Sequence, residues 1–235
     1  MGIALSEIIV NLITIIYLFF TFPKTNKHNY SKFNIKQYFK LMILSFLETI
    51  IRNIIYYFVI LVFLNMIDNQ DLYFVANEFI WSIMLVPILS QNTLIKQEIA
   101  NNNQYSLKPY FINSIILVLY MIILIPISLL LFKYVYGLNN YLEYFYTLLK
   151  LFPCYIIFTF DAVVESYFWA TGQLKHILVQ TILTNILVYV TAYILYLCNV
   201  WVVSLNSITL LFNLGVIVSS IYTISVFIWE KKRKK

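Results

Sequence analysis

The clearest shortage in this sequence is of charge: only 11% of its 235 residues are charged, whereas 62% are hydrophobic. Soluble domains typically contain about 25% charged and about 45–50% apolar residues. Apolar stretches of about 20 residues recur along the chain, which is the length that a helix needs to cross a hydrocarbon core of about 30 Å. The composition therefore excludes an ordinary soluble domain and predicts an integral membrane protein.

Glycine and cysteine are also scarce, with four glycines and two cysteines in all. The sequence contains no glycine-rich phosphate-binding loop, no nucleophile elbow and no zinc-binding motif. Cys154 and Cys198 lack the spacing of a redox or metal pair, and free cysteine in an apolar stretch serves as a small hydrophobe. We therefore expect no enzyme activity, no bound metal and no cofactor.

Several apolar stretches are long enough to span a bilayer, and each is expected to be helical. Lipid cannot satisfy free backbone polar groups, and the alternating polarity of barrel strands is missing. The predicted fold class is all-α, a polytopic transmembrane bundle of about seven helices. The predicted spans are residues 3–22, 41–64, 72–94, 110–132, 148–171, 177–197 and 208–229.

The connections suggest how the chain is organised. We expect a transmembrane helix within residues 1–22, a basic loop over 23–40, a six-helix transmembrane lobe over 41–229 and a basic tail over 230–235. Within the loop, lysines recur every four residues, which favours an amphipathic helix at the membrane surface. A plain cytoplasmic linker is the alternative.

The formal net charge of +6 is distributed so that it orients the chain. Lysines occupy the first, third and fifth connections and the tail, whereas Asp68, Asp71 and Glu143 occupy the second and fourth. Because basic loops remain in the cytoplasm, the pattern predicts an outside N-terminus and a cytoplasmic C-terminus in a plasma membrane. An odd number of helices that begins outside suggests a piece of a longer chain, or a chain that pairs with a partner.

Ionisable residues inside the spans are the functional candidates, because charge in the bilayer is costly and usually faces a bundle interior or a cavity. Glu48 and Arg52 lie four residues apart in the second span, and Asp161 and Glu165 lie four apart in the fifth. A bound proton or cation would relieve the repulsion between neighbouring carboxylates. We therefore predict cation or proton coupling at Asp161, Glu165 and Glu48. A structural ion pair with Arg52 is the alternative.

The outer half of the third span carries further polar residues. Asn77, Glu78 and Trp81 are predicted, together with Arg52, to line a substrate cavity. Exposure of Glu78 to water at the membrane surface is the alternative. Prolines at positions 87, 126 and 153 fall within predicted spans and should bend them, because each removes a backbone hydrogen bond.

Three segments resemble parts of a known transporter family. VANEFIWSIMLVPILSQNTLIKQEIANNN resembles the eighth helix and following loop, LKLFPCYIIFTFDAVVESYFWATGQLKH the tenth helix, and TILTNILVYVTAYILY the eleventh helix of multidrug and toxin extrusion (MATE) transporters. The chain is thus similar to the C-terminal half of a Na⁺-driven multidrug efflux pump. The resemblance implies the last helix of a first lobe followed by a six-helix C-terminal lobe.

The resemblance also implies a function, namely antiport of amphipathic or cationic drugs against Na⁺ or H⁺ by a half or truncated transporter. The family's cation-binding carboxylates on its seventh and tenth helices correspond by position to Glu48 and Asp161. The expected partners are the bilayer, the substrate, the coupling ion and a second lobe or second copy, but no nucleic acid. The alternatives are a lipid-linked precursor flippase, which would need a more basic cavity, and a non-transporting membrane subunit.

Overall fold

The computed structural model describes residues 35–101 and 106–233, all in helices and short connections without a strand in those ranges. The all-α prediction is therefore confirmed for this part of the chain. The predicted span 3–22 and most of the basic loop lie outside the described residues. The chain divides into two compact units, Met1–Tyr38 and Phe39–Lys235, and the packing described below concerns the second unit.

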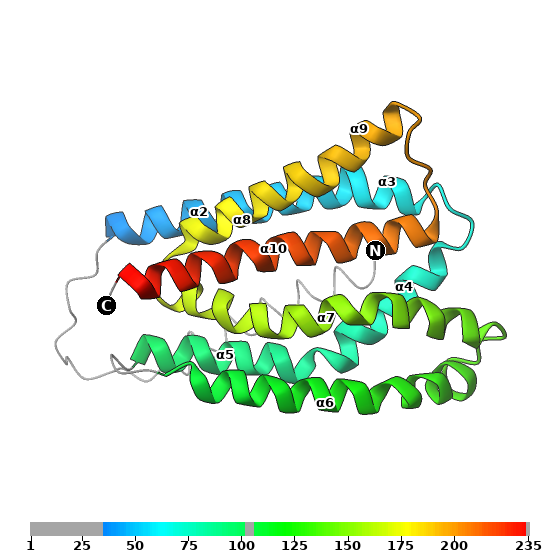
Figure 1. Cartoon of the computed structure of the whole chain (residues 1–235), viewed down its shortest axis with the longest axis horizontal. Helices are drawn as coiled ribbons and strands as arrows, with labels where there is room; N and C mark the ends of the chain where they lie inside the picture. Colours follow the sequence, from blue (N-terminus) through cyan, green and yellow to red (C-terminus); the bar gives the residue numbers. More distant parts are fainter. Residues whose placement is uncertain (1–34, 102–105, 234–235) are drawn as a thin grey trace, which may run out of the picture. The chain divides into compact units, whose positions relative to one another are not determined.

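The described helices follow one another along the chain with short π-helical segments among them (Figure 1). In order they are α2 (Ile35–Ile55), η1 (Tyr56–Ile60), α3 (Leu61–Leu64), α4 (Gln70–Phe79), η2 (Ile80–Met84), α5 (Val86–Asn101), α6 (Lys108–Leu130), η3 (Leu131–Val135), α7 (Tyr141–Ala170), α8 (Leu174–Thr184), η4 (Asn185–Val190), α9 (Thr191–Leu197) and α10 (Leu205–Arg233).

Five helical segments of the described chain are long and apolar enough to cross a membrane. A sixth results if α4–η2 and α5 together form one span. Each corresponds to one predicted span, although α7 begins at Tyr141 rather than at residue 148. The predicted total of seven stays untested, because the remaining stretch lies among residues that are not described.

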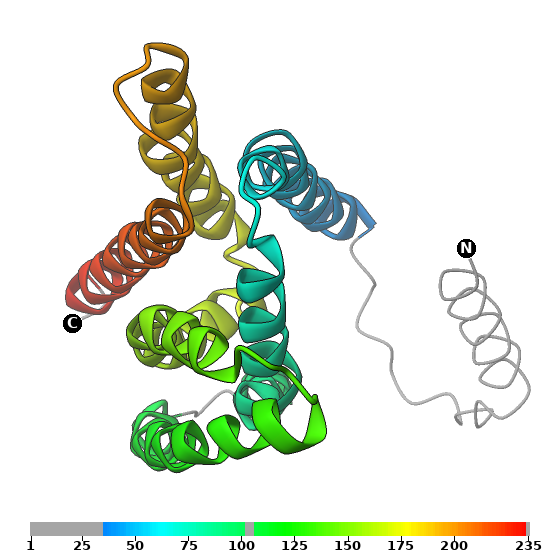
Figure 2. The same ribbon diagram turned by 90° about the vertical axis from the view of Figure 1, so that its right-hand side faces the viewer.

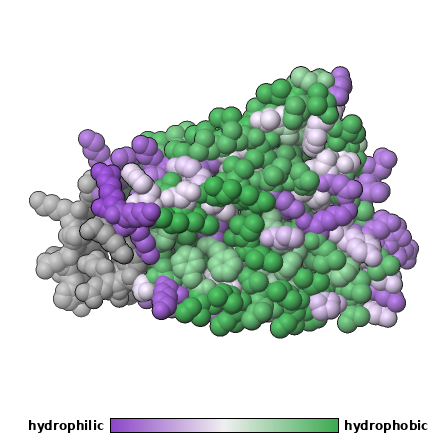
Figure 3. Space-filling model, in the orientation of Figure 1, coloured by the Kyte–Doolittle hydropathy of each residue, from purple (hydrophilic) through white to green (hydrophobic). Residues whose placement is uncertain are grey.

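Helix α7 is the central element of the second unit, since it packs against α4, α5, α6, α8 and α10. Within its most apolar stretch 61% of the residues are buried, compared with 17% for α6. Many large apolar side chains are exposed on the helices, and they form most of the face seen in Figure 3 between the two ends of the bundle. An apolar exterior of this kind suits contact with lipid.

The helices alternate in direction, so that their ends fall into two groups. The C-terminal ends of α5, α7 and α10 and the N-terminal ends of α6 and α8 lie at one end of the unit (Figure 1). These are the ends that the charge pattern assigned to the cytoplasm. In the end-on view of Figure 2, α5 and α6 lie on the opposite side of α7 from α8 and α9, and α4 runs obliquely between α2 and α5.

The predicted bend at Pro87 is present, because α4–η2 and α5 meet at an angle of 50°. Pro87 has no N–H to donate to the carbonyl of Ile83 four residues earlier. The hydroxyl of Tyr120 on α6 donates to that carbonyl at 3.2 Å. The bend is therefore stabilised from a neighbouring helix, whereas Pro126 and Pro153 lie within the continuous helices α6 and α7.

Candidate functional site

A cavity of about 550 Å³ lies within the second unit, lined by residues of α2, α4, α7, α8, α10 and the π-helical segments η1, η2 and η4. Its volume falls within the range of roughly 300–1,000 Å³ that small-molecule pockets usually have. All the candidate site residues named from the sequence line it: Glu48, Arg52, Asn77, Glu78, Trp81, Asp161 and Glu165. The structure thus brings together residues from three predicted spans, while the role of each stays a prediction.

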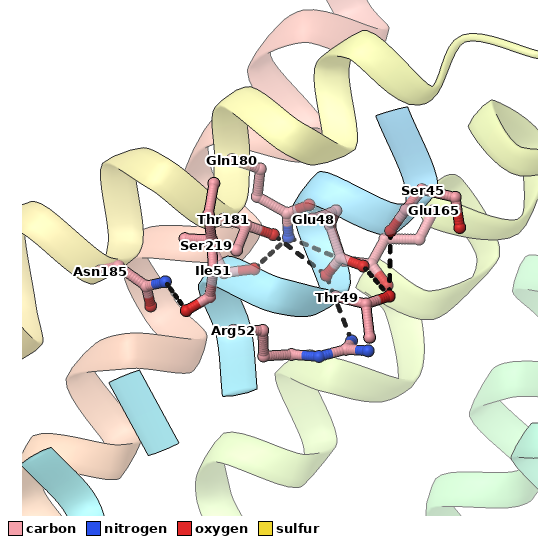
Figure 4. A network of polar contacts seen from close by, with 10 residues as sticks. All are labelled: Ser45, Glu48, Thr49, Ile51, Arg52, Glu165, Gln180, Thr181, Asn185 and Ser219. Atoms are coloured by element: carbon pink, nitrogen blue, oxygen red, sulfur yellow. Dashed lines mark hydrogen bonds and ion pairs between the residues drawn. The ribbon is translucent and has the colours of Figure 1, made fainter. Parts of the chain in front are cut away.

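Glu48 and Arg52 form an ion pair within α2, with 3.3 Å between Arg52 Nη1 and Glu48 Oε1. The Glu48 side chain is only 6% exposed, whereas that of Arg52 is 64% exposed. Thr181 of α8 donates to Glu48 Oε1 at 3.3 Å, whereas the Thr49 hydroxyl lies 3.4 Å from Oε2 and donates at 2.9 Å to the Ser45 carbonyl (Figure 4). The buried carboxylate is therefore held from two helices, and the guanidinium beside it remains accessible.

Glu165 is held by a different set of partners. Gln180 of α8 donates through Nε2 to Glu165 Oε1 at 2.7 Å and also to the Ser219 hydroxyl of α10. Because Gln180 is followed by Thr181, which binds Glu48, α8 connects the carboxylates of α2 and α7 (Figure 4). The sequence interpretation missed Gln180, although an amide within an apolar span was a visible signal.

Asp161 is buried, at 2% exposure, and its Oδ1 has no hydrogen-bond partner within the described residues. The side chains of Ser220 and Thr223 on α10 lie beside its carboxyl group. The Ser220 hydroxyl likewise has no partner in this part of the chain. Buried polar groups are nearly always hydrogen-bonded, so the hydroxyl groups of Ser220 and Thr223 are the neighbours that the Asp161 carboxyl group can bond to.

On the other wall, Asn77 and Trp81 are fixed by Tyr155 of α7. Trp81 Nε1 donates to the Tyr155 hydroxyl at 3.0 Å, and that hydroxyl donates to Asn77 Oδ1 at 2.6 Å. Glu78 is exposed and accepts a hydrogen bond from Ser82 at 2.5 Å. The predicted substrate-cavity residues of α4 and η2 thus include a rigid pair and an accessible carboxylate. Tyr155 was not predicted, since a tyrosine in an apolar span gives no distinctive pattern.

Aromatic side chains complete the lining of the cavity. The ring of Trp81 lies 6.0 Å from that of Phe158, measured between centroids. The other aromatic lining residues are Tyr56, Tyr73, Phe74, Trp169, Tyr189 and Phe212. The π-helical segments η1, η2 and η4 all contribute lining residues, and such segments frequently occur at functional sites.

The carboxylates do not form a ready-made centre for a multivalent metal. Among the residues that the structure describes, no three histidine, cysteine, aspartate or glutamate side chains are placed to hold one metal ion. The arrangement consists instead of single carboxylates, each with its own hydroxyl or amide neighbours. Such groups can take up a proton or share a singly charged cation with nearby hydroxyl oxygens.

The fold and cavity define a helical membrane protein with a partly polar internal site. No protein-family model matches the chain, and no curated protein or solved structure matches it. The functional argument therefore depends on the cavity and on the residues that line it.

Proposed function

We propose that this chain is one lobe of a secondary active transporter that exchanges Na⁺ or H⁺ for an amphipathic substrate by alternating access. The observation that supports this function is the convergence of in-span ionisable residues from α2, α4 and α7 on one cavity with aromatic walls. Polar cavities at membrane depth are where transporters bind their substrates and coupling ions. The resemblance to MATE transporters supports the direction of transport, which would be export.

In this proposal Asp161 is the principal coupling group, with Glu165 and Glu48 contributing. A proton or a cation at Asp161 would supply the partner that its Oδ1 lacks in the described chain. Because Ser220 and Thr223 belong to α10, occupancy of the site would favour close packing of α7 against α10. An ion changes a conformational equilibrium only if it binds one state more tightly, and this contact supplies such a difference.

The remaining lobe would come from a second chain, from the rest of a longer chain or from a second copy. The cavity would then lie against that lobe, and rocking of the two lobes would expose it to each side of the membrane in turn. The chain would act in the plasma membrane, with its C-terminus in the cytoplasm.

The test is ethidium efflux from energised cells that produce this chain, with and without a Na⁺ gradient and a pH gradient. We expect gradient-dependent efflux from the wild-type chain and at least a tenfold lower rate from Asp161→Asn. Glu143→Gln is the matched control, because Glu143 is an exposed carboxylate in the first turn of the same helix. Equal efflux from wild type and Asp161→Asn would remove Asp161 from the mechanism. A folded, membrane-inserted chain without gradient-dependent efflux would refute this function for the chain by itself.

A further inference from the structure

The most exposed charged group deep in the cavity is basic. The Arg52 side chain is 64% exposed, whereas the side chain of Glu48 is 6% exposed and Asp161 is 2% exposed. Glu165 is partly exposed. Glu78 is exposed too, but it lies only roughly 12 Å along its helix from Gln70, at 1.5 Å per residue. Arg52 lies roughly 18 Å from the helix end at Leu64 and so is nearer the middle of its span.

Arg52 has most of its binding capacity free. Within residues 35–101 and 106–233, its one acidic partner is Glu48, through a single nitrogen at 3.3 Å. A guanidinium carries five N–H donors in a planar fork that matches a phosphate or carboxylate group. Thr181 of α8 holds Glu48 independently of Arg52. Arg52 can therefore turn to another anion while Glu48 keeps its hydrogen bond to Thr181.

The surroundings of Arg52 suit a ligand with an apolar body. Tyr56 follows Arg52 by one helical turn and lines the same cavity. Phe158 of α7 and Phe212 of α10 line it from other helices. Aromatic faces bind apolar groups well, and a cavity of about 550 Å³ can enclose a chain of several isoprene or methylene units.

We propose that the cavity binds an amphipathic phosphate, whose anionic group replaces Glu48 as the partner of Arg52 and whose apolar part lies against the aromatic wall. This inference rests on the proposed function, because it takes the cavity as the substrate site. It gives the substrate the opposite charge from that implied by the MATE resemblance. A ligand of this kind is also what the flippase alternative would require.

The binding test uses the purified chain in nanodiscs of zwitterionic lipid, with radiolabelled farnesyl phosphate as the probe. Unlabelled farnesol, which lacks the charge, and inorganic phosphate, which lacks the apolar body, compete for the site in separate arms. We expect farnesyl phosphate to compete at least about tenfold more effectively than either, since hydrogen bonds to a charged group contribute about that factor. Equal competition by inorganic phosphate would point to a plain anion site and overturn the amphipathic part of the proposal.

Variants of the Glu48–Arg52 ion pair distinguish ligand binding by Arg52 from a purely structural role, because the two roles predict different affinities for farnesyl phosphate. Glu48→Gln releases Arg52 and should tighten binding of farnesyl phosphate several-fold. The double variant E48Q/R52Q avoids leaving a buried carboxylate unpaired, and it should bind at least about tenfold more weakly than Glu48→Gln. Lys150→Gln removes an exposed positive charge outside the cavity and should leave binding unchanged.

Two results would overturn the proposal: farnesyl phosphate bound equally well by Glu48→Gln and E48Q/R52Q, or preferential binding of the cationic analogue farnesylamine. The measurement needs no ion gradient, so it is separable from the proposed function. Binding without gradient-driven transport would leave this inference standing and refute transport by this chain alone. Gradient-driven ethidium efflux without farnesyl phosphate binding would support the transporter and overturn this inference.

Discussion

Among single residues, Asp161 combines burial with a carboxyl oxygen that lacks a hydrogen-bond partner in the described chain. Asp161→Asn keeps the shape of the side chain and removes its charge. We expect this variant to be as stable as the wild type or more stable, by up to about 3 kcal/mol, because a buried carboxylate that lacks a full set of hydrogen bonds carries a larger desolvation cost than a neutral amide. The measurement is the thermal unfolding temperature of the purified chain in detergent.

Glu165→Gln is the comparison for this prediction, because Glu165 already accepts a hydrogen bond from Gln180. An amide in its place loses the charge-assisted part of that bond, so this variant should be less stable by about 1 kcal/mol. Equal destabilisation by the two variants would mean that Asp161 is as well satisfied as Glu165.

Gly215 on α10 is a second residue whose substitution should change stability, because the absence of a side chain there lets α10 approach the ring of Tyr189. A Cβ atom at Gly215 would lie 2.9 Å from Tyr189 Cζ and closer still to the hydroxyl oxygen. Gly215→Ala should therefore destabilise the protein by about 1–3 kcal/mol through overpacking. Unfolding in detergent measures the effect, and the double variant with Tyr189→Phe should recover part of it. No recovery would assign the cost to the backbone rather than to this contact.

At this scale the sequence predicted the charged residues that line the cavity, together with Asn77 and Trp81, but missed the neutral residues Gln180 and Tyr155 that hold them. Charge within an apolar span is expensive wherever it points, so the candidates Glu48, Arg52 and Asp161 could be chosen without a structure. Gln180 and Tyr155 are tolerated on many helix faces. Their partners depend on how each helix is rotated about its axis, and that rotation is set by packing against helices distant in sequence.

At the scale of the elements, the bend between η2 and α5 is stabilised by a side chain from α6. Tyr120→Phe removes the donor at the Ile83 carbonyl that Pro87 leaves without its usual partner. We expect a loss of about 1 kcal/mol, the net contribution of one hydrogen bond to a partly buried acceptor. Tyr146→Phe, at an exposed position on α7, should change stability by no more than about 0.5 kcal/mol.

A double-mutant cycle checks the mechanism of this bend. Pro87→Ala restores a backbone N–H that can donate to Ile83, so Tyr120→Phe should cost less in that background. Independent, additive effects of the two substitutions would mean that Tyr120 acts through packing alone.

The elements themselves were predictable only in outline. Hydropathy found the spans because twenty apolar residues have few alternatives in lipid. It placed the start of this span seven residues after the first residue of α7, since the first turn of the helix carries Glu143 and is not uniformly apolar. The π-helical segments η1, η2 and η4 leave no trace in the apolar pattern, because one extra residue in a turn changes packing but not composition.

At the scale of the whole molecule, labelling of the two cysteines can test the orientation of the chain in the membrane. The C-terminal end of α9 lies at the end of the unit opposite the C-terminal end of α10 (Figure 1). Cys198 directly follows α9 and is exposed, whereas Cys154 is buried. We expect a membrane-impermeant maleimide to label Cys198 in intact cells and to leave Cys154 unlabelled. Cys198→Ser should abolish labelling. Labelling that requires permeabilised cells would place the C-terminus outside and reverse the predicted topology.

The buried carboxylates differ in whether their partners lie in the same helix or in a helix that is synthesised later. The Glu48–Arg52 pair closes within one helix, so α2 can enter the bilayer with its charges already matched. Glu165 depends on Gln180 of α8, and Ser220 and Thr223 beside Asp161 belong to α10. Since ribosomes deliver α7 before either of those helices, α7 must wait at the insertion machinery or cross in a neutral form. Synthesis interrupted before α10 should therefore leave α7 the least securely inserted helix of the bundle.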